Sequence, residues 1–154
     1  MPARLVNKAD FERLLGVRPW ARSAHFAVHH VASAPALPPK PAHRAAAHAV
    51  STELSTAPAL VCPPPVDDLP TGHWLGYMVP KRHARRSVTR NLLKRQVRGV
   101  FERHAAGLPG GLWLVRLRQP FVVSAFPSAA SDALRQAARL ELETLFTPAA
   151  ARAR

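Results

Sequence analysis

Side chains that bind phosphate are concentrated in one stretch of the sequence, from Lys81 to His104. This stretch holds nine Lys and Arg residues but a single acid, Glu102. A solvated helical face usually carries both signs, paired at i, i+4 spacing. Here the cations repel one another, and binding of a polyanion would offset that cost. Arginine outnumbers lysine in the stretch, which suits two-point hydrogen bonding to phosphate oxygens, so the pattern predicts a contact with nucleic acid.

Side chains for catalysis or metal binding are scarce elsewhere. The nine acids form no pair in a plausible site, no Ser/His/Asp set occurs, and no cluster has the spacing of metal ligands. His25 and His29 point the same way on a predicted strand, but they lie too far apart along it to hold one ion. Cys62, the single cysteine, excludes an internal disulfide and a cysteine-rich zinc module. The sequence thus predicts no catalytic centre and no zinc site in the protein.

The overall charge limits the choice of partner. Lys and Arg outnumber Asp and Glu by 22 to 9 in 154 residues, for a net charge of +13, which indicates nucleic acid or an anionic membrane. No stretch approaches the roughly 18 to 20 apolar residues of a membrane-spanning helix. Residues 1–15 carry charges among their apolar positions, unlike a signal peptide. We therefore expect a soluble cytoplasmic protein with a nucleic-acid partner and no membrane.

The basic stretch has the period of an amphipathic helix from about residue 87 to residue 106. At about 100° per residue, two sets of side chains fall on nearly opposite sides of the axis. The apolar side comprises Leu93, Val97, Val100 and Phe101. The basic side comprises Asn91, Lys94, Arg95 and Arg98, with Arg90 at its border. We expect the apolar side to pack on a sheet and the Arg90 guanidinium to extend outward, because a long basic side chain lays its stem on apolar neighbours and keeps its charge in water.

The remaining pattern supplies a sheet and two further helices. Helices are predicted over residues 7–15, capped by Asn7, and from Ser128 or Ser131 to Phe146, before a frayed tail over 147–154. Strands are predicted at residues 24–31, 74–79 and 112–117, with a short edge strand between 17 and 23. This order predicts a compact α+β domain that spans residues 1–154.

The segment between predicted strands 24–31 and 74–79 has a different composition. Residues 32–71 hold nine of the sixteen prolines and many alanines, with little aromatic content. Proline interrupts strand ladders, and alanine side chains supply too little apolar bulk to support a core. We expect a flexible insertion that folding does not require.

The residues from Arg90 to Arg98, RNLLKRQVR, resemble the signature R-N-x-x-K-R-x-x-R of the bacterial ribonuclease P protein subunit. The matching context comprises Asp10-Phe11, Phe26-Ala-Val28, Val79-Pro80-Lys81-Arg82, and a Pro-Gly turn before an apolar strand ending in Arg116 and Arg118. The resemblance covers residues 4–31 and 72–146. The proline-rich insertion lies outside it, and the loop His83 to Ser87 lacks the glycine that the family usually has there.

This resemblance implies a fold, an activity and two RNA partners. The implied fold is an α-β-β-β-α-β-α two-layer sandwich like domain 2 of ribosomal protein S5, with a left-handed βαβ crossover around the basic helix. The implied activity is endonucleolytic removal of the 5′ leader from precursor tRNA, by an enzyme whose catalytic centre and Mg²⁺ ions lie mainly in its RNA subunit. The implied partners are the ribonuclease P RNA and precursor tRNA, with no protein partner.

The resemblance also implies two groups of site residues. Those that contact the catalytic RNA are Arg86, Arg90, Asn91, Lys94, Arg95 and Arg98. Those that line the cleft for the single-stranded leader are Phe11, Phe26, His29, Lys81 and Arg82. In such a cleft, flat groups stack on bases and cations follow the backbone.

Some of these assignments have alternatives. Asn91 is also a candidate to orient a hydrated metal ion. Core packing is an equal alternative for Phe11 and Phe26, and it is the expected role of Trp74, Trp113 and Phe101, whereas the role of Tyr77 stays open.

Two other functions are compatible with the residues. A basic RNA- or DNA-binding module outside tRNA processing, such as a ribosome-associated protein, would use the same helix without preferring leader-bearing tRNA. A stand-alone nuclease would need clustered acids to hold metal ions, and the composition disfavours it.

Overall fold

The computed structural model describes residues 2–36 and 70–151, and its elements follow the predicted order. The strands are β1 (Ala3–Arg4), β2 (Ala21–Arg22), β3 (Phe26–Val31), β4 (His73–Met78) and β5 (Gly111–Leu117). The helices are α1 (Lys8–Gly16), α2 (Ser87–His104) and α3 (Asp132–Ala151), with a 3₁₀ turn, η1 (Ala105–Gly107), after α2. From α1 to α3 this is the order α-β-β-β-α-β-α, so the predicted α+β class is confirmed.

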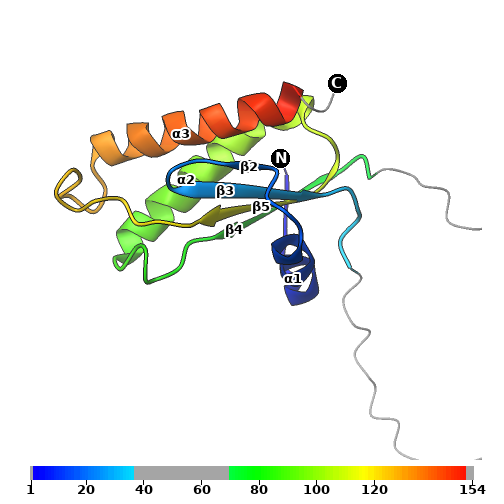
Figure 1. The fold of residues 1–154 in the computed structure, drawn as a ribbon, viewed down its shortest axis with the longest axis horizontal. Coiled ribbons are helices and arrows are strands. Elements are labelled where there is room, and N and C mark those ends of the chain that lie inside the picture. Colours follow the sequence, from blue (N-terminus) through cyan, green and yellow to red (C-terminus); the bar gives the residue numbers. More distant parts are fainter. Residues whose placement is uncertain (1, 37–69, 152–154) are drawn as a thin grey trace, which may run out of the picture. The chain divides into compact units, whose positions relative to one another are not determined.

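The five strands form one mixed sheet in the order β1-β4-β5-β3-β2 (Figure 1). β4 and β5 are parallel neighbours joined through α2, with Leu75 opposite Trp113. β3 runs antiparallel to β5, and β2 runs antiparallel to β3. β1 pairs in parallel with β4 over two residues, and the sequence did not predict it because so short a strand shows no alternation. The left-handed sense of the crossover through α2 stays a prediction.

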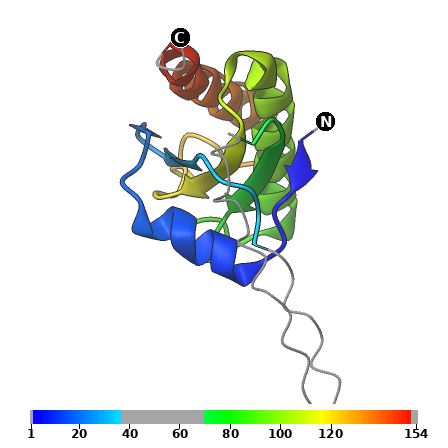
Figure 2. The ribbon, with the colours of Figure 1, turned by 90° about the vertical axis from the view of Figure 1, so that its right-hand side faces the viewer.

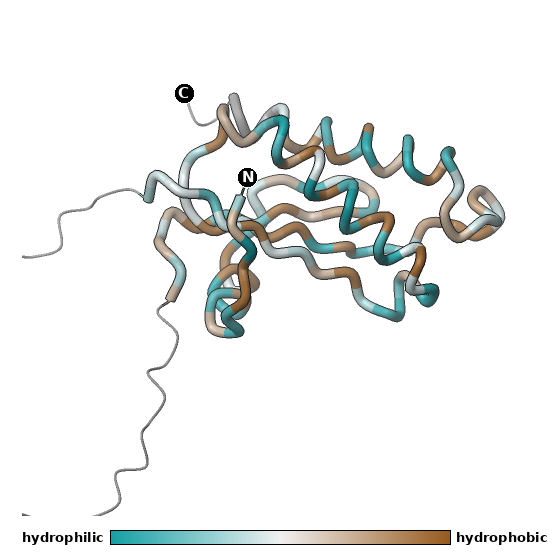
Figure 3. The backbone as a smooth tube through the Cα atoms, turned by 180° about the vertical axis from the view of Figure 1, so that it is seen from behind, coloured by the Kyte–Doolittle hydropathy of each residue, from teal (hydrophilic) through white to brown (hydrophobic). Residues whose placement is uncertain are grey.

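The two faces of the sheet are covered differently. α2 and α3 pack against one face, and α1 lies on the other (Figure 1, Figure 2). Successive side chains of a strand point to opposite faces, so β5 contributes Trp113 and Val115 to the larger core under α2 and α3, and Leu112 and Leu114 to a smaller core under α1. Figure 3 shows the resulting concentration of hydrophobic residues along the strands.

α1 is capped by Asn7, as predicted, and it also holds the chain that follows β3. The Asn7 side chain accepts a hydrogen bond from the Ala9 amide and donates one to the Ala36 carbonyl at 3.2 Å. The carboxylate of Asp10, which is fully buried, accepts the Ala36 amide at 3.0 and 3.2 Å. Residues 32–36, predicted as the start of the insertion, are therefore fixed on α1, while 37–69 lie outside the described residues.

α3 begins after Ser131, one of the two predicted caps, whose hydroxyl accepts a hydrogen bond from the Leu134 amide at 3.1 Å. The helix continues past its predicted end at Phe146, so residues 147–151 are helical rather than frayed. Alanine has the highest helix propensity and is frequent in this last turn, and the Thr147 hydroxyl donates to the Glu143 carbonyl at 2.8 Å. The inner side of the helix is formed by Leu134, Ala138, Leu142 and Leu145, as predicted.

A carboxylate on α3 anchors the hairpin of β2 and β3. Glu141 accepts hydrogen bonds from the Ser23 hydroxyl, from the His25 amide at 2.6 Å and from His25 Nδ1 at 2.8 Å. Burial opposes ionisation of Glu141, but these donors outweigh it and lower the pKa of the carboxyl. The partners are 116 and 118 residues apart in the chain, so no local pattern predicted the contact.

Gly76 sets how closely α1 approaches the sheet. A Cβ atom at this position would lie 2.9 Å from Cε1 of Phe11 and 3.0 Å from Cδ2 of Leu5. Both side chains therefore pack on β4 because residue 76 has no side chain of its own.

Gly76→Val should lower the free energy of unfolding by about 1–2 kcal/mol. Overpacking typically costs about 1–3 kcal/mol, and the better strand propensity of valine offsets up to about 1 kcal/mol of it. Gly99→Ala on α2 is the control, because a Cβ there meets only the Arg103 guanidinium at 3.9 Å, and it should raise the free energy by about 0.5–1 kcal/mol. Urea unfolding followed by circular dichroism measures both changes. A Gly76→Val protein as stable as the parent would contradict the close packing.

Candidate nucleic-acid interface

The outer side of α2 is an exposed surface of cations. Asn91, Arg95 and Arg98 are exposed, and Lys94 is half-buried with its ammonium 5.7 Å from the centre of the Tyr77 ring; these four residues are called the basic face of α2 below. The opposite side is buried and comprises Leu92, Leu93, Val97, Val100 and Phe101. The predicted division into an apolar and a basic side is therefore confirmed.

Acidic neighbours do not neutralise the basic face of α2. Within residues 2–36 and 70–151, Arg103 is the one Lys or Arg of α2 that forms an ion pair, with Glu143 at 2.8 Å. Glu143 also pairs with Arg139 of α3 at 3.0 Å. The ion pairs thus lie toward the C-terminal end of α2, and the basic face stays available to an external anion.

Arg90 differs from the other residues of the signature. Its side chain is half-buried, and its Nη1 donates hydrogen bonds to the carbonyls of Ala84 at 2.9 Å and Arg85 at 2.6 Å. The sequence predicted that this guanidinium extends outward, whereas the structure directs it onto the preceding turn. The reason is that carbonyls without a helical partner lie within reach of a border residue, and a charged donor satisfies them. Arg90 therefore positions the turn, and its contact with RNA stays a prediction.

The N-terminal end of α2 is an electropositive site. The helix begins at Ser87 after the exposed N-cap residue Arg86, which makes no side-chain cap hydrogen bond, and its first turn contains no acid. The helix dipole places partial positive charge at this end. Lys81 and Arg82 are exposed in the turn just before it, and Arg82 Nε donates to His83 Nε2 at 3.2 Å. The charges of these cations and the positive end of the helix dipole therefore reinforce one another here.

The five residues predicted to line the leader cleft do not form one group. Phe26 is 0% exposed and lies in the core under α2 and α3, opposite Leu117. His29 is three residues further along β3 and so points to the other face, where α1 lies. Phe11 is half-buried on that same face, against Gly76. The prediction that Phe26 contacts the leader is therefore wrong, and its alternative, core packing, is correct.

The surroundings of His29 favour its neutral form. It is 5% exposed, and its ring nitrogen Nδ1 donates a hydrogen bond to the Val17 carbonyl at 3.0 Å. Burial lowers the pKa of His29, the Val17 bond opposes this, and the charges of Arg116 and Arg22 lower the pKa further. The residue therefore offers a flat neutral ring rather than a positive charge.

A cavity of about 280 Å³ on the α1 side of the sheet adds residues that the sequence did not assign to the site. We call it the α1-face cavity, and it is lined by Leu15, Val17, Pro19, Arg22, Ala27, His29, Arg116 and Arg118. Arg116 Nε is buried and has no hydrogen-bond partner among the described residues. Arg116 also lies close enough to His83 to help lower its pKa, after burial and the charge of Arg82. Alternation along β5 would have placed Arg116 and Arg118 away from the main core. No pattern in the sequence indicated that Arg22 belongs to the same site.

Groups that could hold a metal ion or form a catalytic relay were sought among the described residues. They contain no group of three or more His, Cys, Asp or Glu that could hold a metal. Ser23 and His25 both donate to Glu141 rather than forming a serine–histidine–acid relay. Asn91 lines a pocket with Arg95 and Arg135, whose charges repel a cation. None of the helices described is long and apolar enough to cross a membrane.

Fold and surface together define a class, the small α+β proteins that expose a helix whose outer cations form no ion pair among the described residues. Comparison with known proteins identifies the family. The model of the ribonuclease P family matches residues 1–147. The ribonuclease P protein component of Paraburkholderia xenovorans (strain LB400) is 31% identical over 150 residues, which are 96% of this chain and 81% of that protein. That of Bordetella parapertussis is 40% identical over 83 residues, which are 54% of this chain and 63% of that protein.

The chain belongs to the ribonuclease P protein family. The fold has a counterpart of known structure, the RNase P protein of Staphylococcus aureus, with a TM-score of 0.56 and 18% sequence identity. The match covers 97% of this chain and 96% of that one. The predicted family is therefore confirmed by sequence, and the predicted fold by structure.

Arg90→Ala should lower the free energy of unfolding by about 1–2 kcal/mol, because the carbonyls of Ala84 and Arg85 lose a charged donor. Arg98→Ala is the control; this exposed arginine makes no ion pair in the described structure, so its loss should change stability by less than about 0.5 kcal/mol. Thermal and urea unfolding of both variants measure the difference. Equal stability of the two would show that Arg90 does not hold the turn.

Proposed function

We propose that this chain is the protein subunit of ribonuclease P. It binds the catalytic RNA through the basic face of α2 and the 5′ leader of precursor tRNA on the α1 side of the sheet, and it promotes endonucleolytic removal of that leader. The observation that carries the proposal is the basic face of α2, where signature residues are exposed together without ion pairs among the described residues. This role places the protein in the cytoplasm with two RNA partners.

The basic face of α2 suits an RNA backbone. Lys94, Arg95 and Arg98 lie within about one and a half helical turns, and none of the described acids has to be displaced before they meet a phosphate. Each phosphate contact releases condensed counterions, so binding should depend steeply on salt. Arg86, at the electropositive N-terminus of the same helix, extends this surface.

The α1-face cavity suits a single strand. Arg116 Nε is a charged donor, buried and unpaired in the described structure, and such a donor is costly until it finds an acceptor. A phosphate oxygen would supply one, with Arg22 and Arg118 beside it. Phe11 and the neutral ring of His29 provide flat groups on the same face, where unstacked bases could lie. Lys81 and Arg82 would continue the cationic path, because Arg116 influences their neighbour His83.

The proposed division of labour leaves catalysis to the RNA. Mg²⁺ requires several oxygen ligands, and Asn91 offers one amide oxygen among arginines, so the chain's described residues do not fit a magnesium site. The ions would be held mainly by the RNA subunit, where they would supply the metal-ion chemistry of the cleavage. The protein's own contribution is binding and neutralisation of charge.

A reconstitution assay tests this function against its alternatives. The protein is mixed with a bacterial ribonuclease P RNA at low Mg²⁺, and cleavage of precursor tRNA is followed. We expect the protein to accelerate cleavage. No acceleration would favour an RNA-binding module outside tRNA processing, and cleavage by the protein alone would favour a nuclease.

The triple variant Lys94→Ala, Arg95→Ala, Arg98→Ala should bind the catalytic RNA more weakly and with less dependence on salt. Losing three phosphate contacts should reduce the slope of log affinity against log salt by about 2–3. Arg139→Ala removes one arginine from α3, outside the proposed surfaces, and should leave both affinity and slope near those of the parent. Filter binding at several KCl concentrations measures the slopes. An unchanged slope in the triple variant would show that RNA binds elsewhere.

Arg116→Ala should weaken binding of precursor tRNA by the holoenzyme about tenfold, because a charge-assisted hydrogen bond to phosphate is worth about 1.5 kcal/mol or more. Mature tRNA, which has no leader, is the internal control, and its affinity should not change. Equilibrium binding in Ca²⁺, which slows cleavage, compares the two RNAs. A similar loss for both would place Arg116 outside the leader contact.

A further inference from the structure

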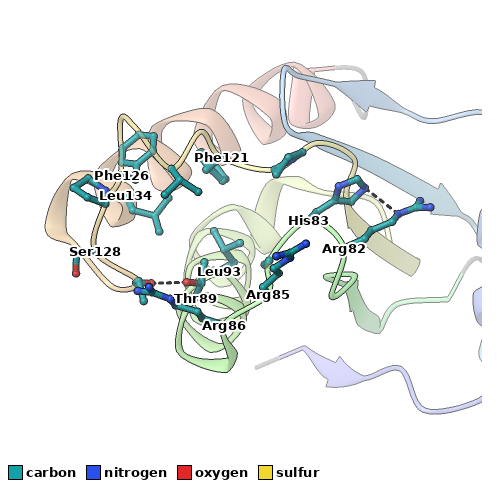
Figure 4. A pocket seen from close by; sticks show the side chains of 15 residues that line it. Arg82, His83, Arg85, Arg86, Thr89, Leu93, Phe121, Phe126, Ser128 and Leu134 are labelled. Atoms are coloured by element: carbon teal, nitrogen blue, oxygen red, sulfur yellow. Dashed lines mark hydrogen bonds between the residues drawn. The ribbon is translucent and has the colours of Figure 1, made fainter.

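An apolar cavity lies at the N-terminal end of α2, next to the proposed RNA surface, with which it shares Arg86. It is a cavity of about 360 Å³ between the turn after β4, the first turns of α2 and the loop that joins β5 to α3 (Figure 4). Its size falls in the range of small-ligand sites, about 300–1,000 Å³. We call it the α2 N-terminal cavity.

The inner wall of this cavity is apolar and aromatic. It is formed by Leu93, Phe121, Phe126 and Leu134 (Figure 4). Phe121 and Phe126 are half-buried and meet edge to face at 5.7 Å, so part of each ring borders the cavity. Flat apolar walls of this kind take a nucleobase whatever its identity, because every base has a π-face.

The walls are held in place by contacts outside the cavity. Phe121 stacks on His25, with ring centres 4.0 Å apart and an interplanar angle of 10°, and Glu141 in turn holds His25. The Thr89 hydroxyl of α2 donates to the Ala129 carbonyl at 2.7 Å, which ties the loop to the helix. A cavity formed in advance costs less to fill than one that must first be ordered.

The rim of the cavity is basic. Arg82, His83, Arg85 and Arg86 line it, and no acid is among its lining residues. Arg85 and Arg86 are exposed, and Arg86 is the N-cap residue of a helix whose first turn has neither a side-chain cap nor an acid. Arginines and the positive end of the helix dipole therefore converge beside an aromatic wall.

We propose that the α2 N-terminal cavity binds one unpaired nucleotide of an RNA strand. The base lies against Phe121 and Phe126, and its phosphate is held by Arg85, Arg86 and the N-terminus of α2. Apolar wall and cationic rim match the two halves of a nucleotide, and the cavity is too small for a protein helix. The proposal rests on the proposed function, since the strand would belong to the RNA that lies on the basic face of α2.

Photocrosslinking with the full chain tests the proposal directly. A bacterial ribonuclease P RNA containing 4-thiouridine is irradiated in complex with the protein and the crosslinked tryptic peptides are identified. Trypsin cuts after Arg118 and Arg135, so Phe121 and Phe126 lie in the single peptide 119–135. We expect crosslinks in this peptide as well as in peptides of α2. Crosslinks in α2 peptides alone would overturn the nucleotide site and leave the proposed function intact.

Variants separate stacking from charge. Phe126→Leu keeps an apolar side chain but removes a ring, and it should lower RNA affinity about fivefold, the lower end for loss of one base–aromatic stack, with an unchanged salt slope. Arg85→Ala should lower the slope by about one. Ser128→Trp, at an exposed lining position, should obstruct the cavity without removing core contacts and should give the same loss as Phe126→Leu.

Two results would overturn the proposal. If Phe126→Leu and Ser128→Trp, with unfolding midpoints like the parent's, bind RNA as the parent does, the cavity holds no nucleotide. If RNA leaves peptide 119–135 unlabelled while a photoreactive peptide of glutamates labels it, the occupant is a protein. Arg98→Ala serves as reference, because its loss of affinity depends on the basic face of α2 and not on the cavity.

Discussion

Three aromatic rings fix the place of the basic helix. Phe101 of α2 meets Trp113 of β5 at 5.8 Å and Phe146 of α3 at 5.6 Å, and Trp113 meets Phe146 at 6.3 Å. All three side chains are fully buried, so the helix has one way to lie on the sheet. With that orientation set, Asn91, Lys94, Arg95 and Arg98 have to face outward. The position of the proposed RNA surface is thus a consequence of core packing on the other side of the same helix.

The sheet separates two kinds of surface. Along β5, alternate residues go to the core under α2 and α3, and Arg116 goes to the other face, where α1 leaves a cavity. α1 covers only part of that face and lies close to it because Gly76 has no side chain. The same alternation excludes Phe26 from the α1 side and places His29 there. The pair of β3 and β5 therefore contributes both to the hydrophobic core and to the α1-face cavity with its arginines.

The excess of positive charge destabilises the folded chain. With a net charge of +13, the folded chain repels itself, and that repulsion is relieved only when an anion binds. Two of the described acids serve structural roles: Asp10 holds Ala36, and Glu141 holds the hairpin of β2 and β3. Glu143 pairs with Arg103 and Arg139 at a distance from the signature residues. The cations of the proposed RNA surface thus keep their charge available.

The sequence by itself determined the elements and the signature. Helical period placed α2 and divided it into sides, Asn7 and Ser131 marked helix starts, and the residues from Arg90 to Arg98 indicated the family. These features are local, because hydrogen bonding within a helix and the spacing of its side chains depend on neighbours within four residues.

Only the tertiary structure decided what each side chain meets. Phe26 and His29 were assigned to one cleft, although residues three apart in a strand point to opposite faces, and only the packing showed which face was core. The Arg90 guanidinium donates to carbonyls of the preceding turn instead of extending into solvent. The α1-face cavity joins residues from β2, β3 and β5, and the α2 N-terminal cavity joins α2 to the loop before α3. Such contacts depend on how distant segments pack, and the period of a single element carries no information about that packing.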